Sequence, residues 1–228
     1  MSKTILVVGA SRGIGLETVK RFAADPSNTI VCFARSFDKN HTLNVYSNVH
    51  LHALDLSLSN VNEQLQPVID QLDRIDILIN NAGYIVVKPF TELSHAEIQT
   101  AYQVNVIGVM QTIQTCFPKL KSGTHIVNIS SMGGFQGSMK FAGLSAYSTS
   151  KAAVVSLTEL LAEELKETGI KINCLCLGAV QTEMLETAFP GYKAPLLPVE
   201  MADYIYDFAI NASRFMHGKI IPVSLTTP

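Results

Sequence analysis

The sequence predicts an α/β fold, with one doubly wound parallel β-sheet of about seven strands and helices on both faces. Apolar runs alternate with amphipathic stretches along the whole chain, which is the pattern of successive βαβ units. The runs are continuous Val/Ile/Leu segments, so both faces of each strand are expected to be buried. At 228 residues, 47% hydrophobic and 16% charged, the chain has the size and composition of a single domain over residues 1–228.

Each element is supported by its own local pattern. Strands are predicted for the apolar runs TILVVG (4–9), NTIVCFA (28–34), VHLHALD (49–55), IDILINNAG (75–83), THIVNISS (124–131), IKINCLCLG (170–178) and GKIIPVS (218–224). Helices are predicted for the stretches between them, over 13–25, 60–72, 94–117, 145–169 and 199–212. Pro67 is expected to end or kink the second helix, and Ser94 with Glu97 has capping-box spacing at the start of the third.

Composition and charge exclude several classes of function. The net charge of -2 gives no general attraction to nucleic acid or to an anionic membrane. The first apolar run is too short for a secretory signal, and no run has the length of a membrane span, so we expect a soluble, cytoplasmic protein. His50 and His52 lie two apart without a third ligand nearby and are expected to be strand-edge residues rather than a metal site. Buried, reduced thiols are expected for Cys32, Cys116, Cys174 and Cys176.

The loop after the first strand reads GASRGIG and contains Gly9, Gly13 and Gly15. Glycines let a backbone turn tightly and approach a pyrophosphate, and the following helix offers unpaired N–H groups. Ligands of doubly wound sheets bind beyond the carboxyl ends of the strands, where this loop lies. The position between a strand and a helix makes a dinucleotide site the favoured interpretation.

The segment AYSTSKAA places Tyr147 one helical turn before Lys151. A free phenol, with a pKa near 10, is a poor acid or base at neutral pH. An ammonium one turn away would lower that pKa toward the working range. The spacing by itself does not distinguish such a pair from an ordinary helix surface.

Six motifs in order make the chain resemble the short-chain dehydrogenase/reductase family in its single-domain, Rossmann-like form. They are GASRGIG, NNAG (80–83), NVIG (105–108), NISS (128–131), YSTSK (147–151) and NCLCLGAVQT (173–182). The resemblance implies that Tyr147 is the general acid and base and that Lys151 lowers its pKa. It also implies that Ser131 hydrogen-bonds the substrate oxygen and that Asn105 positions a water of the proton relay. It further implies a substrate lid at about 183–197 and a cofactor site formed by Gly9, Ser11, Arg12, Gly13, Ile14, Gly15, Arg35, Asp55, Leu56, Asn81, Ala82, Gly83, Tyr147, Lys151, Val180 and Thr182.

The second strand indicates which nicotinamide cofactor to expect. Its end carries Ala34 where an NAD-binding acid normally holds the ribose, and Arg35 follows. An arginine suits a 2′-phosphate, and Arg12 points to the same place in relatives. We therefore expect NADP(H) in preference to NAD(H), with an NADPH-dependent reductase or alcohol dehydrogenase as the first hypothesis. An NADP(H)-binding regulator or sensor with little turnover is the alternative, and an epimerase is disfavoured by length and glycine spacing.

The chain departs from the family pattern at three places. Leu177-Gly178 replaces the usual Pro-Gly, the interval from Ser131 to Tyr147 is a few residues longer, and the segment after Thr182 is short. The longer interval carries Met and Phe side chains, which suit an apolar carbonyl substrate or pack on their own domain. Small residues after Lys151 suggest a homodimer or homotetramer by resemblance.

Overall fold

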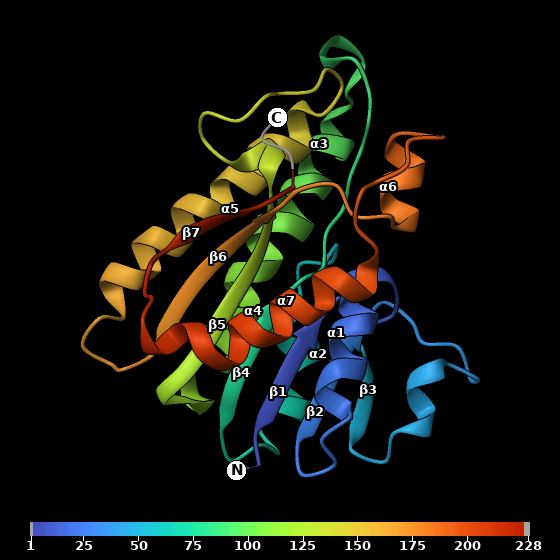
Figure 1. The fold of residues 1–228 in the computed structure, drawn as a ribbon. Helices are drawn as coiled ribbons and strands as arrows, with labels where there is room; N and C mark the ends of the chain where they lie inside the picture. The colour runs from blue at the N-terminus through green and yellow to red at the C-terminus, as the bar shows by residue number, and fades with distance from the viewer. Residues whose placement is uncertain (1, 226–228) are drawn as a thin grey trace.

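The computed structural model describes residues 2–225, which form a seven-stranded parallel sheet (Figure 1). The strands are β1 (Thr4–Val8), β2 (Thr29–Ala34), β3 (Val49–Ala53), β4 (Ile75–Asn80), β5 (Leu120–Ser131), β6 (Lys171–Leu177) and β7 (Ile220–Val223). Their order is β3-β2-β1-β4-β5-β6-β7, and every neighbouring pair is parallel. The predicted fold class is confirmed.

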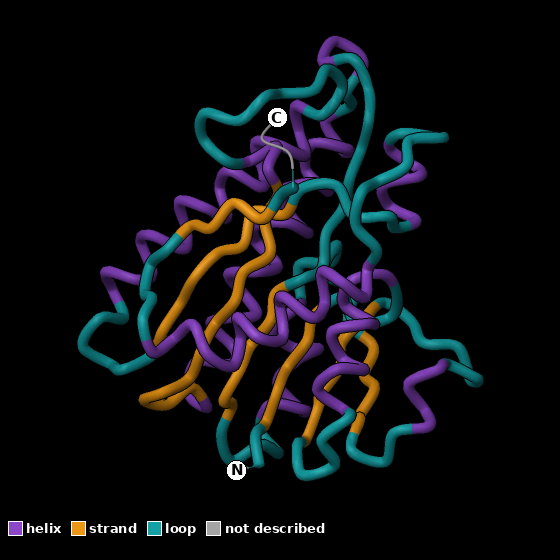
Figure 2. The backbone as a smooth tube through the Cα atoms, viewed as in Figure 1, coloured by secondary structure: helices purple, strands orange, loops and turns teal. Residues whose placement is uncertain are grey.

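Helices cover both faces of this sheet (Figure 2). They are α1 (Gly13–Ala23), α2 (Val61–Ile69), α3 (His95–Tyr102), α4 (Gly108–Cys116), α5 (Ser145–Glu164), α6 (Glu183–Ala188) and α7 (Pro198–Asn211). Side chains of α1 and α7 fill the core on one face, and those of α2, α4 and α5 fill the core on the other. None of the helices in the described part of the chain is long and apolar enough to cross a membrane.

The strand order reverses between β1 and β4, and this places the site. The chain runs from β1 outward to β3 and then returns to β4, so the loops after β1 and β4 leave the sheet side by side. Backbone hydrogen bonds join them, because Asn81 N and Ala82 N both donate to Val8 O, at 3.0 and 2.8 Å. The crevice at this reversal is where a ligand of a doubly wound sheet is expected.

The helix predicted over 94–117 is interrupted. A π-helical turn, Gln103–Ile107, separates α3 from α4 and contains Asn105. The capping box at its start is present, with Ser94 and Glu97 hydrogen-bonded reciprocally. π-Turns insert one extra residue into a helix and are frequent at functional sites. The periodicity of the sequence gave no sign of the interruption, because apolar spacing on both sides stays helical.

Other boundaries shift by a few residues. β5 begins at Leu120 rather than 124, and α5 ends at Glu164 rather than 169. Pro67 lies in the last turn of α2, which ends two residues later. His50 and His52 are on β3, an edge strand. The thiols of Cys32, Cys116, Cys174 and Cys176 are free and buried, as predicted.

A buried histidine in the middle of β5 is held in its neutral form by two hydrogen bonds. His125 is 1% exposed. Its Nδ1 donates to Ala209 O, and its Nε2 accepts from Asn173 Nδ2, both at 2.9 Å. The amide orientation of Asn173 is fixed, because its Oδ1 accepts from Lys219 N. Burial lowers the pKa of His125.

This histidine should make the protein acid-sensitive. The unfolded side chain titrates near pH 6.5, so its contribution to stability is full above that pH and is lost as the pH falls through the lowered folded pKa. We expect the free energy of unfolding to fall by up to about 1.4 kcal/mol per pH unit from this group. His52, whose pKa burial also lowers, adds to the slope.

Urea unfolding between pH 7.5 and 5.5 measures the effect. His125→Gln should have a flatter pH dependence than the wild type, while His95→Gln, at an exposed position at the start of α3, should keep the wild-type slope. A His125→Gln variant with the full slope would contradict the assignment.

Candidate active site

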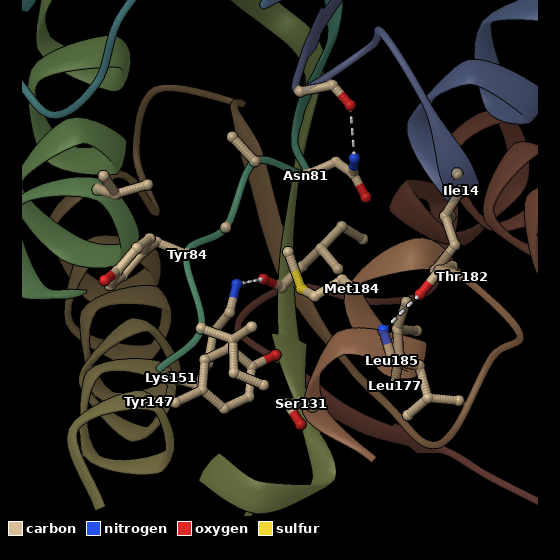
Figure 3. Close-up of a pocket in the computed structure, with 18 of the residues that line it drawn as sticks. Ile14, Asn81, Tyr84, Ser131, Tyr147, Lys151, Leu177, Thr182, Met184 and Leu185 are labelled. Atoms are coloured by element: carbon tan, nitrogen blue, oxygen red, sulfur yellow. Dashed lines mark hydrogen bonds between the residues drawn. The ribbon is translucent and has the colours of Figure 1, made fainter. Parts of the chain in front are cut away.

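The glycine loop after β1 is locked onto the segment after β4. Gly9 has a φ of +89°, and a Cβ there would lie 2.6 Å from the backbone of Ala82. A Cβ on Gly15 would lie 2.0 Å from Gly9 O and 2.5 Å from Asn81 Nδ2. Asn81 Nδ2 donates to Gly9 O at 2.8 Å (Figure 3). Only glycine fits at either position.

The start of α1 faces the same crevice. Its N-cap residue, Arg12, is extended and makes no side-chain capping hydrogen bond. The first backbone N–H groups of α1 therefore lack a side-chain cap, which favours an anion at this position. The glycine loop and the helix start together have the form of a phosphate-binding turn.

A cavity of about 690 Å³ runs from this loop to the end of β5. Its lining includes nearly all the residues predicted to bind a cofactor, namely Gly9, Ser11, Arg12, Gly13, Ile14, Arg35, Asp55, Leu56, Asn81, Ala82, Gly83, Tyr147, Lys151, Val180 and Thr182. Gly15 lies behind the loop and Asn105 behind Gly83, so neither lines the cavity.

Ser131 and Tyr147 meet at the far end of the cavity (Figure 3). Ser131 is the last residue of β5, and Tyr147 is in the first turn of α5. The Ser131 hydroxyl lies close enough to Tyr147 to act on the pKa of the phenol, and Ser131 Oγ accepts from Gly133 N at 3.1 Å. Two neighbouring hydroxyls at the cavity wall can together contact one substrate oxygen.

The pKa of Tyr147 departs from the sequence-based expectation. We expected Lys151 to lower it. Instead, burial is the largest effect and raises the pKa of Tyr147, and the neighbouring Ser131 hydroxyl offsets this only in part. Lys151 donates instead to Ile129 O at 2.9 Å and is 4% exposed. Burial lowers the pKa of Lys151 to about 8. The spacing in the sequence could not indicate this, because it carries no information on burial.

Asn105 is fully buried and fixes the wall opposite Lys151. Its Oδ1 accepts from Tyr84 N at 2.8 Å, and its Nδ2 donates to Tyr84 O and to Ser150 Oγ, both at 2.9 Å. A Cβ added to Gly83 would lie 3.5 Å from Lys151 Nζ and 3.6 Å from Asn105 Oδ1. Both polar atoms therefore face the same small volume beside Gly83.

Two serines that the sequence-based prediction missed hold α5 in place. Ser130 Oγ donates to Lys151 O at 2.8 Å. Ser150 Oγ donates to Tyr147 O at 2.7 Å while accepting from Asn105. Their positions directly before Ser131 and Lys151 were the available signal, although a serine beside a functional residue is not specific by itself.

The two arginines have different surroundings. Arg35 follows directly after β2. Hydrogen bonds from Ser57 lower the pKa of the Asp55 carboxyl, and the nearby charge of Arg35 lowers it further. Arg12, which was expected to point toward the 2′-phosphate, forms an ion pair in which its Nη1 is 2.5 Å from Glu183 Oε2. The sequence-based prediction did not include Glu183.

The two unusual loops meet above the cavity. α6 follows Thr182, whose Oγ1 accepts from Leu185 N at 3.2 Å. The ring of Phe189, just after α6, contacts the ring of Phe141 from the longer loop, with centroids 6.0 Å apart. The two ends of the segment 181–196 are joined by Gln181 N, which donates to Leu196 O at 2.8 Å. Leu177, at the departure from Pro-Gly, is buried, and Gly178 N donates to Val223 O.

Comparisons with known proteins identify the family of this chain. Residues 3–193 match the family model of short chain dehydrogenase. The chain is 31% identical to a diacetyl reductase [(S)-acetoin forming] of Staphylococcus epidermidis, over 97% of this chain and 96% of that protein. Its fold is similar to 4-hydroxyisoleucine dehydrogenase complexed with NADH, with a TM-score of 0.83, 25% identity and coverage of 97% of each chain. It is also similar to ElxO with NADP bound, with a TM-score of 0.85, 26% identity and coverage of 98% of this chain and 97% of the other.

Proposed function

Because the chain belongs to the short-chain dehydrogenase family of oxidoreductases, we propose that it interconverts a ketone or aldehyde with an alcohol using NADP(H). Tyr147 is the general acid in reduction and the general base in oxidation. The observation that carries this proposal is the meeting of Ser131, Tyr147 and Lys151 at one end of a groove whose other end is a glycine loop.

The groove fits a dinucleotide. Glycine at positions 9 and 15 keeps the loop in the form that exposes the start of α1, and the cavity reaches from there to Tyr147. A nicotinamide cofactor bound in it would supply the hydride and, when oxidised, a positive charge beside the phenol.

Three side chains stabilise the developing charge and transfer the proton. The Ser131 hydroxyl donates to the carbonyl oxygen and stabilises the charge that develops there. The Tyr147 hydroxyl gives its proton to the same oxygen as the alkoxide forms. The ammonium of Lys151 lies one turn along the same helix and favours the phenolate that remains.

A proton from solvent then reaches Tyr147 through Lys151 and a water that Asn105 positions. Lys151 is buried, so it needs an internal route to solvent. Its Nζ and Asn105 Oδ1 face a common volume beside Gly83, and a water held there would link them.

Arg35 carries the proposed preference for NADP(H). It is exposed at the end of β2 and lines the cavity, next to Ala34 rather than to an acid. A guanidinium forms charge-assisted hydrogen bonds with a phosphate.

Arg35→Ala should raise the KM for NADPH by about 10- to 100-fold, the range of a lost charged hydrogen bond. The KM for NADH should change less than about twofold, because NADH lacks the phosphate that Arg35 would contact. Steady-state kinetics with both cofactors measures the difference, and Arg214→Ala, outside the cavity lining, is the control. Equal effects on the two cofactors would refute the assignment.

The substrate is proposed to be an apolar carbonyl compound. Outside the cofactor-binding set, the cavity lining includes the apolar and aromatic residues Tyr84, Ile85, Val104, Met132, Phe141, Leu144, Met184, Leu185 and Phe189. Among the described lining residues outside the cofactor-binding set, only Glu183 is charged. Its carboxylate is paired with Arg12. A lining of this kind favours uncharged substrates over carboxylates and phosphates.

A homodimer or homotetramer is proposed as well. Ile107 and Met110 near α4, Phe117 after it and Leu160 on α5 are exposed apolar side chains. These helices cover the same face of the sheet, and burying that surface against a second copy would stabilise it.

A spectrophotometric screen tests the function. NADPH or NADH is combined with apolar aldehydes, diketones including diacetyl, quinones and keto acids, and nicotinamide absorbance is followed. We expect turnover with NADPH and uncharged carbonyls, with kcat/KM rising with apolar size. Tight NADPH binding without any turnover would instead favour the regulator or sensor.

A further inference from the structure

We propose that Glu183 tunes the choice of cofactor by competing with the 2′-phosphate of NADP(H) for Arg12. The proposal rests on the function proposed above, and it identifies a specificity-determining residue outside the catalytic cluster. Its basis is the ion pair that joins the two walls of the cofactor groove, with Arg12 on the glycine loop and Glu183 on the lid.

The ion pair is short and open to solvent. Arg12 Nη1 and Glu183 Oε2 are 2.5 Å apart, and the side chains are 59% and 70% exposed. Both residues line the cavity that also holds Arg35 and Tyr147. The guanidinium of Arg12 is therefore already engaged by an anion on the lid side of the groove.

The backbone of Glu183 is held at this position. Thr182 lies close to the glycine loop, because a Cβ added to Gly13 would be 3.5 Å from Thr182 Cγ2. Ala194 N donates to Gln181 Oε1 at 2.8 Å, which also joins the two ends of the segment 181–196. The backbone that carries the Glu183 carboxylate is therefore held next to the glycine loop.

The two cofactors differ in whether they offer Arg12 a phosphate. NADH has no 2′-phosphate, so the ion pair with Glu183 can persist when NADH binds. A 2′-phosphate recruits Arg12 and must first break that pair. An exposed ion pair contributes little, so its competition should weaken NADPH binding by about two- to fivefold.

Isothermal titration calorimetry of the intact protein with NADPH and NADH tests the competition. Glu183→Gln should tighten NADPH binding by about two- to fivefold and change NADH binding by less than about 1.5-fold. Glu186→Gln is the matched control, because it removes the same charge from the same helix and keeps an oxygen to accept from Gly191 N. The gain for NADPH should shrink at high salt.

The result also has to depend on Arg12. In an Arg12→Ala background, Glu183→Gln should leave the ratio of the two dissociation constants unchanged. The same shift with and without Arg12, an equal effect on both cofactors, or weaker NADPH binding would each overturn the proposal. The wild-type ratio tests the proposed preference for NADP(H) separately, so the two can fail independently.

Discussion

Tyr147→Phe is expected to lower kcat by about 10³-fold, within the range of a lost general acid. The phenylalanine ring fills the same volume between β5 and α5, so the cavity should keep its shape. The proposed mechanism has no replacement for this proton, since the Ser131 hydroxyl, which accepts from Gly133 N, is proposed only to hydrogen-bond the substrate oxygen. The dissociation constant for NADPH should change less than about threefold, because the cofactor gains most of its binding elsewhere in the groove.

Single-turnover kinetics and calorimetry separate the two effects. Tyr206→Phe is a suitable control, because Tyr206 packs against Phe22 and lies outside the cavity lining. Unchanged turnover in Tyr147→Phe would eliminate the proposed acid. An equal loss in the Tyr206→Phe control would point to a general effect on stability.

The pH profile of the wild type gives a further check on Tyr147. Burial raises its pKa in the structure, so the free enzyme should hold the phenol protonated at neutral pH. Reduction, which needs the acid, should then be favoured at neutral pH, and oxidation, which needs the base, should increase toward alkaline pH.

Gly15→Ala should abolish cofactor binding, with a loss of at least about 100-fold, and destabilise the protein by about 3 kcal/mol or more. The new Cβ would overlap Gly9 O at 2.0 Å and Asn81 Nδ2 at 2.5 Å. Both atoms belong to the hydrogen bond that joins the glycine loop to the segment after β4. Relieving the overlap would move the loop away from the start of α1, where the phosphates would lie.

Gly137→Ala is the informative control for this prediction. Gly137 has a φ of +82° and nothing within 4 Å of an added Cβ, so its substitution carries only a backbone cost of about 1–2 kcal/mol. Gly15 is not in the left-handed region, so its larger expected effect comes from overlap alone. Chemical unfolding and NADPH titration of both variants would show whether the loss of binding is specific to Gly15. A Gly15→Ala protein that binds NADPH normally would contradict the packing of the loop.

Local patterns were sufficient for the fold, and the resemblance to a known family supplied most of the candidate site. The continuous apolar runs predicted buried parallel strands, because a strand covered on both faces excludes polar side chains. The glycines of GASRGIG and the Tyr147–Lys151 spacing predicted a phosphate loop and a helical pair, and the structure places both at one cavity. These features depend on neighbours within a few residues of one another, so a single sequence contains them.

The interruption of the helix at Asn105 was outside the reach of such patterns. The π-turn keeps the apolar spacing on both sides, and its reason lies in the hydrogen bonds of Asn105 with Tyr84 and Ser150. Those partners are brought to Asn105 by the sheet and by α5, not by the chain around it.

What the sequence determined by itself is therefore the doubly wound sheet, the order of its elements and the residue types at the carboxyl ends of the strands. The tertiary structure alone decided that burial raises the pKa of Tyr147, where Lys151 was expected to lower it. It also decided that Phe141 touches Phe189 and that Arg12 pairs with Glu183, 171 residues away. The physical reason is that secondary structure follows from local sterics and periodicity. Burial and charge pairing depend on which distant segments the fold brings together.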